Sequence, residues 1–365
     1  MVPAPPGTMR LRMMIALLTM VALGAACEKP EEKKGGEETA TTEETKTQEV
    51  KEEEPKAKEL TVYCGRNEEM LKPLMEKFQK DKGVTLKVQY AKSAQLAATL
   101  MEEGDASPAD IFFAQDVSTL GFLQKEGKLV KLSDDLLNKV PETYRSKDGK
   151  WVGISGRARV FTYNTKLKPE ELPKDVDALL DARWKGKLGW APENASFQSF
   201  VAAMIAERGE EKTLEWVKGI AALEPKAYPK NTPLVTAVGR GEIDGGLTNH
   251  YYLFRLKAEN GDDFAAANHY FKNGKAESLV NAAGVGVLEK SKNKKVAEEL
   301  IAFLLSEESQ KYFAEKTHEF PMLDGMAPAD KLPKISELAP PATDLSTLGD
   351  LAGAVKVLRE AGVIK

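Results

Sequence analysis

Apolar side chains follow two different periods along the chain, and their alternation indicates an α/β protein. Residues 60–63 form a short β-branched and aromatic run, and residues 68–80 then carry apolar side chains at helical spacing. Residues 85–90 alternate as a half-buried strand does, residues 95–101 return to helical spacing, and residues 109–113 are typical of a buried strand. Strands and helices in this order predict a parallel sheet with helical crossovers.

The alternation of predicted strands and helices continues through the rest of the chain. The later predicted elements are strands at 159–163, 187–191, 243–248 and 282–288, and helices at 197–207, 251–259, 295–305 and 309–316. A length of 365 residues favours two lobes. We therefore expect lobe 1 over about 59–160 plus part of 282–365, and lobe 2 over about 161–281 plus the remainder. Each lobe is predicted to be a mixed, mostly parallel sheet flanked by helices.

The N-terminus has the pattern of an export signal. Two arginines precede the apolar run Met13–Leu23, which is too short for a comfortable membrane span, and three small residues then lead to Cys27. Small residues directly before a cysteine resemble a bacterial lipoprotein cleavage site, although Gly24 stands where that pattern prefers leucine. The sequence predicts a signal peptide over 1–27 with lipidation at Cys27; the alternative is an ordinary secretory signal with a chance cysteine.

The next segment, 28–58, predicts a disordered charged linker. It consists mainly of Glu, Lys, Thr and Gly and contains no Leu, Ile, Phe, Trp or Tyr, so it cannot bury enough apolar surface to offset its ordering entropy. A signal, a cysteine and a polar linker place the body, 59–365, outside the cytoplasm and tethered to a membrane. A net charge of only -4 does not indicate a nucleic-acid-binding protein. Two cysteines are too few for a fold held together by several disulfides.

Polar side chains follow several of the predicted strands, where an open α/β sheet places its ligand cleft. Asn194-Ala195-Ser196 also precedes a helix, so its amides can face an anion at the positive helix end. The candidate cleft residues that follow predicted strands are Arg66, Asn67, Glu68, Gln115, Asp116, Asn194, Ala195, Ser196, Asn231 and Asn249.

Two adjacent tyrosines, Tyr251 and Tyr252, begin a predicted helix directly after a predicted strand. Side chains one residue apart diverge by about 100° on a helix, so both can reach one ion in front of its first turn. A phenol is ordinarily neutral, with a pKa near 10, but a trivalent cation favours the phenolate, and Fe(III) suits anionic oxygen donors. From spacing alone, the more common arrangement is that both rings simply pack the helix start against the sheet.

Seven stretches of the chain together form a specific pattern: 61–66, 102–105, 108–112, 155–160, 184–187, 249–252 and 319–321. Through them, from about Glu59 to Lys365, the chain resembles the bacterial periplasmic ferric-binding proteins. The resemblance implies a two-lobed periplasmic-binding-protein clamshell of type II-like organisation, with Fe(III) in the cleft between the lobes. It also implies an ABC permease and ATPase as partners, and we expect the chain to be a monomer.

The resemblance also implies roles for individual residues. Tyr251 and Tyr252 match the metal ligands, and the pocket for a synergistic anion, carbonate or phosphate, corresponds to Asn194, Ala195, Ser196, Asn231 and Asn249. Many members add a histidine and a glutamate as ligands, and Asn67 and Gln115 stand in those positions here. The neighbouring Glu68 and Asp116 are alternative ligands. Arg66 and Arg157 are candidates to neutralise the anion, or members of salt bridges.

Two other functions are compatible with parts of this pattern. The same clamshell binding a phosphonate, a polyamine or an organic anion is favoured by the missing histidine and glutamate. An enzyme is disfavoured, because the chain has no G-x-S-x-G elbow, phosphate loop or H-E-x-x-H motif. A thiol–imidazole pair would require Cys64 and His250, and we interpret Cys64 as a buried apolar thiol and His250 as a packing or supporting residue.

Overall fold

The computed structural model describes residues 58–329, 332–349 and 351–365. The predicted signal peptide, the lipidation site Cys27 and the predicted linker up to residue 57 lie outside the described residues. Within the described part of the chain, no helix is long and apolar enough to cross a membrane.

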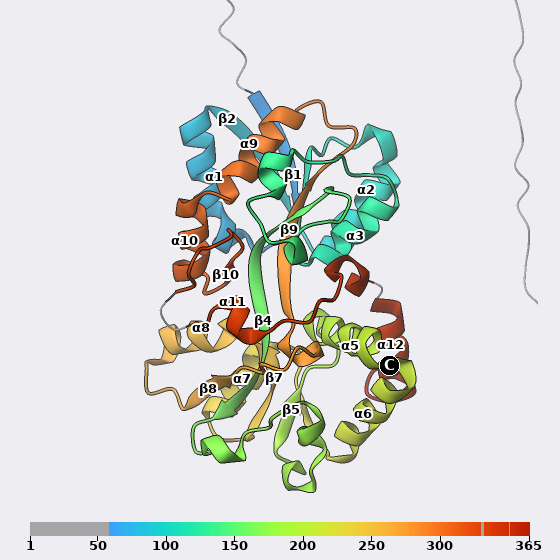
Figure 1. The fold of residues 1–365 in the computed structure, drawn as a ribbon, viewed down its shortest axis with the longest axis vertical. Helices are drawn as coiled ribbons and strands as arrows, with labels where there is room; N and C mark the ends of the chain where they lie inside the picture. The colour runs from blue at the N-terminus through green and yellow to red at the C-terminus, as the bar shows by residue number, and fades with distance from the viewer. Residues whose placement is uncertain (1–57, 330–331, 350) are drawn as a thin grey trace, which may run out of the picture. The chain divides into compact units, whose positions relative to one another are not determined.

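Strands in the described residues join into one mixed sheet system, in the order β2-β1-β3-β9-β4-β7-β5-β6, with β8 and β10 also pairing with β4 (Figure 1). The strands are β1 (Lys58–Cys64), β2 (Val84–Tyr90), β3 (Ile111–Ala114), β4 (Val152–Asn164), β5 (Leu188–Trp190), β6 (Lys226–Ala227), β7 (Gly245–Asn249), β8 (Ala266–His269), β9 (Val280–Val287) and β10 (Phe320–Pro321). The α/β fold expected from the sequence is confirmed.

Helices flank this sheet system. They are α1 (Glu68–Lys82), α2 (Ser93–Glu103), α3 (Val117–Lys125), α4 (Asp134–Leu137), α5 (Ala195–Arg208), α6 (Glu210–Ala222), α7 (Asn231–Gly239), α8 (Tyr251–Asn260), α9 (Lys294–Leu304), α10 (Glu307–Lys316), α11 (Ile335–Leu338) and α12 (Leu351–Glu360). Of the longer helices, α6, α7 and α12 were not predicted from the sequence. In Figure 1, α1, α9 and α10 lie on one side of the upper strands, and α2 and α3 lie on the other.

The long strand β4 connects the two lobes. Its first half, through Ala158, pairs antiparallel with β9, and its second half, from Arg159, pairs antiparallel with β7 and β8. Parallel pairing occurs where helices provide the crossovers, between β1 and its neighbours β2 and β3 and between β5 and its neighbours β6 and β7. Strand β9 lies between β3 and β4 in the sheet order, and the lobe boundaries given from the sequence stay a prediction. Residues near the middle of β4 therefore face the junction between the lobes.

Helix α1 shows how local sequence signals produced correct predictions. Its apolar residues at helical spacing, including Leu71, Leu74 and Phe78, are buried, as expected for an amphipathic helix. Asn67 accepts a hydrogen bond from the Met70 amide and caps the N-terminus, because the first amides of a helix lack intrahelical partners. The C-terminus ends at a glycine in the left-handed conformation.

The C-terminal segment contacts both lobes. A 3₁₀ turn, η7 (Leu345–Gly349), packs against α3 of lobe 1, and α12 packs against α5 and α6 of lobe 2. Both α3 and α5 begin at the junction between the lobes, so this segment ties together two elements that border the same space.

Gly121 permits the close approach of η7 to α3. A Cβ atom at this position would clash with the Ser346 carbonyl oxygen and would lie 2.8 Å from the Ser346 Cβ atom. We therefore expect Gly121→Ala to destabilise the protein by about 1–3 kcal/mol, although glycine to alanine in a helix usually stabilises. Urea unfolding measures the change. The matched control is Gly353→Ala in α12, where the nearest atom is 3.9 Å away. A neutral or stabilising Gly121→Ala would show that this contact is not tight.

Candidate functional site

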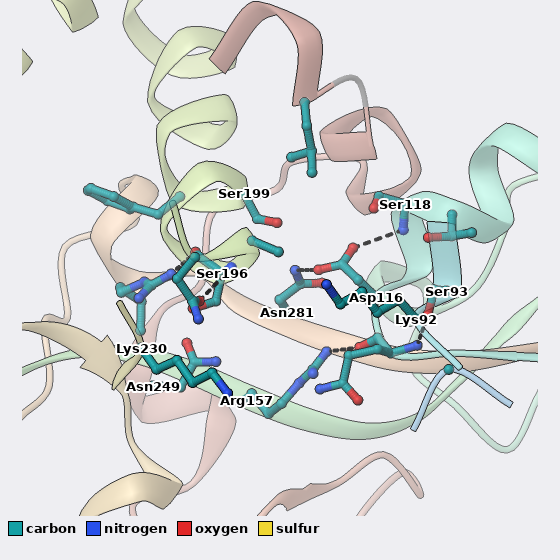
Figure 2. Close-up of a pocket in the computed structure, with 18 of the residues that line it drawn as sticks. Lys92, Ser93, Asp116, Ser118, Arg157, Ser196, Ser199, Lys230, Asn249 and Asn281 are labelled. Atoms are coloured by element: carbon teal, nitrogen blue, oxygen red, sulfur yellow. Dashed lines mark hydrogen bonds between the residues drawn. The ribbon is translucent and has the colours of Figure 1, made fainter. Parts of the chain in front are cut away.

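A cavity of about 580 Å³ lies where β4 passes between the lobes. Gln115 and Asp116 line it from lobe 1, Arg157 and Arg159 line it from β4, and residues after the strands of lobe 2 line the opposite wall (Figure 2). The cavity therefore lies at the junction where strand topology places the ligand cleft of such folds.

Several helices begin at this cavity. Residues at or beside the N-termini of α2, α3, α5, α7 and α8 line it: Ser93, Asp116, Asn194, Lys230 and Tyr251. A helix N-terminus carries a partial positive charge and unpaired amides, which favour negative charge in front of it. Their convergence makes the cavity favourable for an anion or for an anionic complex.

Tyr251 and Tyr252, in the first turn of α8, both line the cavity. Their rings stack with centroids 4.3 Å apart and an angle of 29° between the planes, and Tyr251 is only 7% exposed. Burial, followed by the neighbouring Tyr252, raises the pKa of the Tyr251 phenol, so without a bound cation this group is protonated at neutral pH. Both phenols therefore lie beside one cavity, and their role as metal ligands stays a prediction.

His250 anchors the start of α8. Its buried ring accepts a hydrogen bond at Nδ1 from the Ala158 amide (3.1 Å) and donates from Nε2 to the His318 carbonyl oxygen (2.6 Å). Burial lowers the pKa of this imidazole to about 4, which keeps it neutral. His250 is a supporting residue: it fixes the helix start from β4 on one side and from the segment after α10 on the other.

The predicted anion loop lies at the N-terminus of α5. The Asn194 side-chain oxygen accepts hydrogen bonds from the Ser196 amide (3.0 Å) and hydroxyl (2.7 Å), and the Asn231 amide donates to the Ser196 hydroxyl (3.1 Å). Asn194, Ala195, Ser196 and Asn249 line the cavity, whereas Asn231 lies behind them, 1% exposed. These contacts fix the loop, and their role in anion binding stays a prediction.

Two arginines, Arg157 and Arg159, project from the same face of β4, as alternate residues of a strand do. Arg157 donates to the Gln115 carbonyl oxygen in lobe 1, and Arg159 donates to the Ser196 carbonyl oxygen in lobe 2. Each is 5% exposed, and Arg159 Nη1 has no hydrogen-bond partner among the described residues. Burial lowers the pKa of Arg159 to about 10, so it remains charged. The sequence analysis proposed only Arg157; two-residue periodicity would have indicated Arg159.

The candidate residues of lobe 1 divide into two groups. Gln115 and Asp116 line the cavity: the Gln115 side-chain oxygen accepts from Arg66 (3.0 Å), and Asp116 caps α3 and accepts from the Asn281 amide. Asn67 and Glu68 are exposed at the start of α1 and do not line it. In this arrangement, the first loop presents neither side chain to the cavity.

Arg66 forms a buried ion pair beside the cavity. Its Nη2 atom lies 2.6 Å from Glu319 Oε2, and both side chains are 1% exposed. Glu319 also accepts a hydrogen bond from Ser155 (2.9 Å). Burial alone would raise the pKa of Glu319, but Arg66 and Arg157 hold it below its ordinary value. Of the two roles considered for Arg66, the structure shows the salt bridge.

Several lining residues were absent from the sequence-based site. They are Lys92, Ser93, Ser199, Lys230, Asn281 and Leu351, in addition to Arg159. Lys92 and Lys230 precede helices, as Asn194 does, so the helix starts could have indicated both residues. Leu351 begins the unpredicted helix α12 and reaches the cavity through tertiary packing alone.

Cys64 is fully buried at the end of β1, and burial raises the pKa of its thiol to about 12. At pH 8 about one molecule in 10⁴ would carry the reactive thiolate. We therefore expect the Cys64 peptide to stay unmodified when native protein is treated with iodoacetamide, and to be alkylated fully in urea. Peptide mass mapping separates Cys64 from Cys27. Rapid alkylation of Cys64 in native protein would contradict this burial and would support the alternative of an enzyme with a thiol–imidazole pair.

The donor set limits which metal could bind here. No group of three or more His, Cys, Asp or Glu side chains in the described ranges is arranged to hold a metal ion. Zinc prefers His and Cys, and calcium or magnesium requires several carboxylate or carbonyl oxygens. A pair of phenols with neighbouring anion-binding groups instead suits a hard, highly charged cation that is bound together with an anion.

Comparison with known proteins identifies similar chains. Residues 73–340 match the family model described as bacterial extracellular solute-binding protein. The major ferric iron-binding protein of Neisseria meningitidis serogroup B is 32% identical over 316 residues, which cover 85% of this chain and 94% of that protein.

Solved structures are similar over the same part of the chain. Iron-bound HitA from Pseudomonas aeruginosa superposes with a TM-score of 0.77 at 34% identity, covering 84% of this chain and 99% of that one. The Trichodesmium protein solved with iron and citrate has a TM-score of 0.73 at 29% identity, covering 84% of this chain and all of the other. These similarities span the body that carries the cavity.

Proposed function

Because the chain belongs to the bacterial extracellular solute-binding proteins, within the periplasmic ferric-binding group, we propose that it binds Fe(III) in the cavity between its lobes for import by an ABC transporter. It is a binding protein and not an enzyme. Fe(III) is the cargo, and it is passed on unchanged.

One observation supports this proposal above the others: both adjacent phenols of α8 line the interlobe cavity, in front of the helix start. Side chains that only packed the helix against the sheet would face the interior. Stacked rings 4.3 Å apart bring both hydroxyl groups to one region, where a single cation can contact both oxygens. A trivalent ion displaces the phenolic protons because its charge outweighs the cost of ionising buried phenols.

An anion completes the iron site in this proposal. Carbonate or phosphate is our expectation from the sequence, and the N-terminus of α5 with Asn249 offers amide donors for it. The similar Trichodesmium protein, which was solved with iron and citrate, supports a site that holds iron together with a further ligand. Arg157 and Arg159 supply positive charge beside the same loop.

The cellular setting follows from the family and the N-terminus. We propose an extracytoplasmic, periplasmic or cell-surface protein, anchored through a lipid on Cys27, that delivers its cargo to a permease and its ATPase. The signal-like residues before Cys27 and the apolar-poor segment after it support the anchor. A monomer fits a clamshell whose site lies wholly within one chain.

Metal analysis of protein purified from cells, together with its visible absorption spectrum, tests the proposed function. The proposal predicts about one iron per chain and a tyrosinate-to-iron charge-transfer band. A thermal-shift screen against phosphonates, polyamines and organic anions forms the second arm. If the purified protein is colourless, contains no iron and is stabilised by one of those solutes, that solute and not iron is the cargo.

A further inference from the structure

Glu319 lies between α10 and β10, and three side chains hold its carboxylate in place. Its Oε2 atom accepts hydrogen bonds from Arg66 Nη2 (2.6 Å), Ser155 Oγ (2.9 Å) and Thr317 Oγ1 (3.2 Å). The side chain is 1% exposed and does not line the cavity. A buried carboxylate held at three points cannot contact cargo itself, but it can fix the position of a group that does.

Arg66 connects Glu319 to the cavity wall. Its two terminal nitrogen atoms face different acceptors: Nη2 lies 2.6 Å from Glu319, and Nη1 donates to the Gln115 side-chain oxygen (3.0 Å). A guanidinium is a rigid planar group, so fixing one nitrogen on Glu319 also fixes the direction in which the other nitrogen donates. Arg66 does not line the cavity, whereas Gln115 does. Gln115 is therefore the residue through which this ion pair can act on cargo.

The contact with Arg66 decides which end of the Gln115 amide is free. Arginine has only donors, so the end of the amide that faces it is the oxygen. The backbone of Gln115 is fixed as well, because its amide donates to Ser93 Oγ (2.9 Å) and its carbonyl oxygen accepts from Arg157. Within the described ranges the side-chain nitrogen, Nε2, makes no hydrogen bond. Gln115 thus offers N–H donors to the cavity, and its oxygen, already turned toward one cation, is a poor ligand for another.

The residue before Glu319 contacts the helix that carries the two tyrosines. The His318 carbonyl oxygen accepts from Nε2 of His250 (2.6 Å), the N-cap residue of α8, and the His318 ring stacks on Phe254 of the same helix with centroids 5.1 Å apart. His318 has a φ of 55°, in the left-handed region that residues other than glycine rarely adopt. Two neighbouring residues therefore hold both the start of α8 and, through the ion pair, the amide of Gln115.

We propose that Glu319 is a positioning residue of the iron site: through Arg66 it holds Gln115 with its amide N–H groups toward the cavity, where they donate to an oxygen atom bound beside the iron. This inference rests on the proposed function, because the iron cargo brings that oxygen into the cavity. The role differs from that of the glutamate which the family resemblance places at this position. A glutamate gives iron an oxygen ligand, whereas this glutamine gives hydrogen bonds to what the iron carries.

A double-mutant cycle in the full chain tests this coupling, with Fe(III) in bicarbonate buffer as the probe. Glu319→Gln keeps the size of the side chain and removes the charge that orients Arg66, and Gln115→Met removes the amide from the cavity wall. We expect each change to lower Fe(III) affinity about tenfold, as loss of a residue that supports a metal site does. In Gln115→Met protein, Glu319→Gln should lower the affinity by less than about twofold, because its effect passes through Gln115.

Urea unfolding of the same variants separates positioning from stability, because a purely structural role would change stability alone. The matched control is Asp110→Asn. Asp110 is also a buried carboxylate, 5% exposed, which accepts from Ser291 Oγ (2.6 Å) and the Thr61 amide (2.9 Å) and does not line the cavity. This control should lower stability and keep the Fe(III) affinity. Arg66→Lys serves if Glu319→Gln does not fold: it keeps the buried cation, loses the fork that reaches both partners, and should lower affinity in the same way.

The outcomes separate this inference from the proposed function. Equal losses of affinity from Glu319→Gln in both backgrounds would overturn the inference, because Glu319 would then act independently of Gln115. An unchanged affinity in either single variant, or an equal loss in Asp110→Asn, would also overturn it. The tyrosinate-to-iron band should persist throughout the cycle, since Tyr251 and Tyr252 are unchanged. Failure of the proposed function appears separately, as absence of iron binding and of this band in the unmodified protein.

Discussion

Replacing Tyr251 and Tyr252 together by phenylalanine is expected to abolish the visible charge-transfer band of the iron-loaded protein and to weaken Fe(III) binding more than about 100-fold. Substituting a residue that only supports a metal ligand already lowers metal affinity about 10–100-fold. Removing two direct ligands should therefore lower the affinity by more than that. The change removes two oxygen atoms and keeps both rings, and the fold should therefore persist. Iron titration followed by absorbance measures both effects.

The control for this variant is Tyr163→Phe, which makes the same chemical change on β4 at a residue that does not line the cavity. It should keep the band and the affinity. Each single variant, Tyr251→Phe or Tyr252→Phe, should retain a weakened band because one phenolate remains. A double variant that binds iron as the unmodified protein does would remove the tyrosines from the site.

Arg66→Leu is expected to destabilise the protein by about 3–5 kcal/mol, because it leaves the Glu319 carboxylate buried without its cation. Glu319 is 1% exposed, and its pKa is held below the ordinary value chiefly by Arg66 against the opposing effect of burial. A lowered pKa means that this stabilisation is present above the ordinary glutamate range and is lost as pH falls through the folded value. Urea unfolding at pH 7 and pH 4 measures both effects.

Ser155→Ala provides the comparison for Arg66→Leu. It removes one hydrogen bond that a neutral hydroxyl donates to the same carboxylate and should cost about 1.5–3 kcal/mol, with the ion pair intact. A cost below 1 kcal/mol for Arg66→Leu would mean that Glu319 finds another partner, such as Arg157, or reaches water.

The fold was predictable where local pattern and packing agree. The strands β1 and β2 and the helices α1 and α8 bury one face or lie in a sheet, so their apolar spacing reveals them. Helix α7 contains a proline, Pro233, and its N-cap residue, Lys230, is not one of the Ser, Thr, Asp or Asn residues that typically begin a helix, so its start gave no clear signal. Helix α12 buries Ala354, Val357 and Leu358 at helical spacing, a local pattern that would have indicated it.

Prediction of the site depended on two different kinds of information. The position of Tyr251 and Tyr252 after a strand allowed a shared metal site, but spacing alone favoured simple packing of the rings. The family resemblance was the reason to prefer the metal site. The structure places both in the cavity together with most of the anion loop, and it places Asn67 and Glu68 outside. The metal and anion roles of these residues stay predictions.

The residues that the sequence analysis missed share a physical reason. Two-residue periodicity could have indicated Arg159, and a position before a helix could have indicated Lys92 and Lys230, but neither pattern shows which charges face a cavity. Burial of a guanidinium without a counter-ion, and two uncapped helix ends facing each other across a cavity, are properties of the folded chain. A sequence shows charge, but it does not show which charges lack a partner.

Anomalous diffraction at the iron absorption edge, from crystals of the iron-loaded protein, tests the central claim most directly. The account predicts a single strong peak in the interlobe cavity, within bonding distance of the phenolic oxygens of both Tyr251 and Tyr252. A peak elsewhere, or iron in the cavity with both rings turned away from it, would contradict the account.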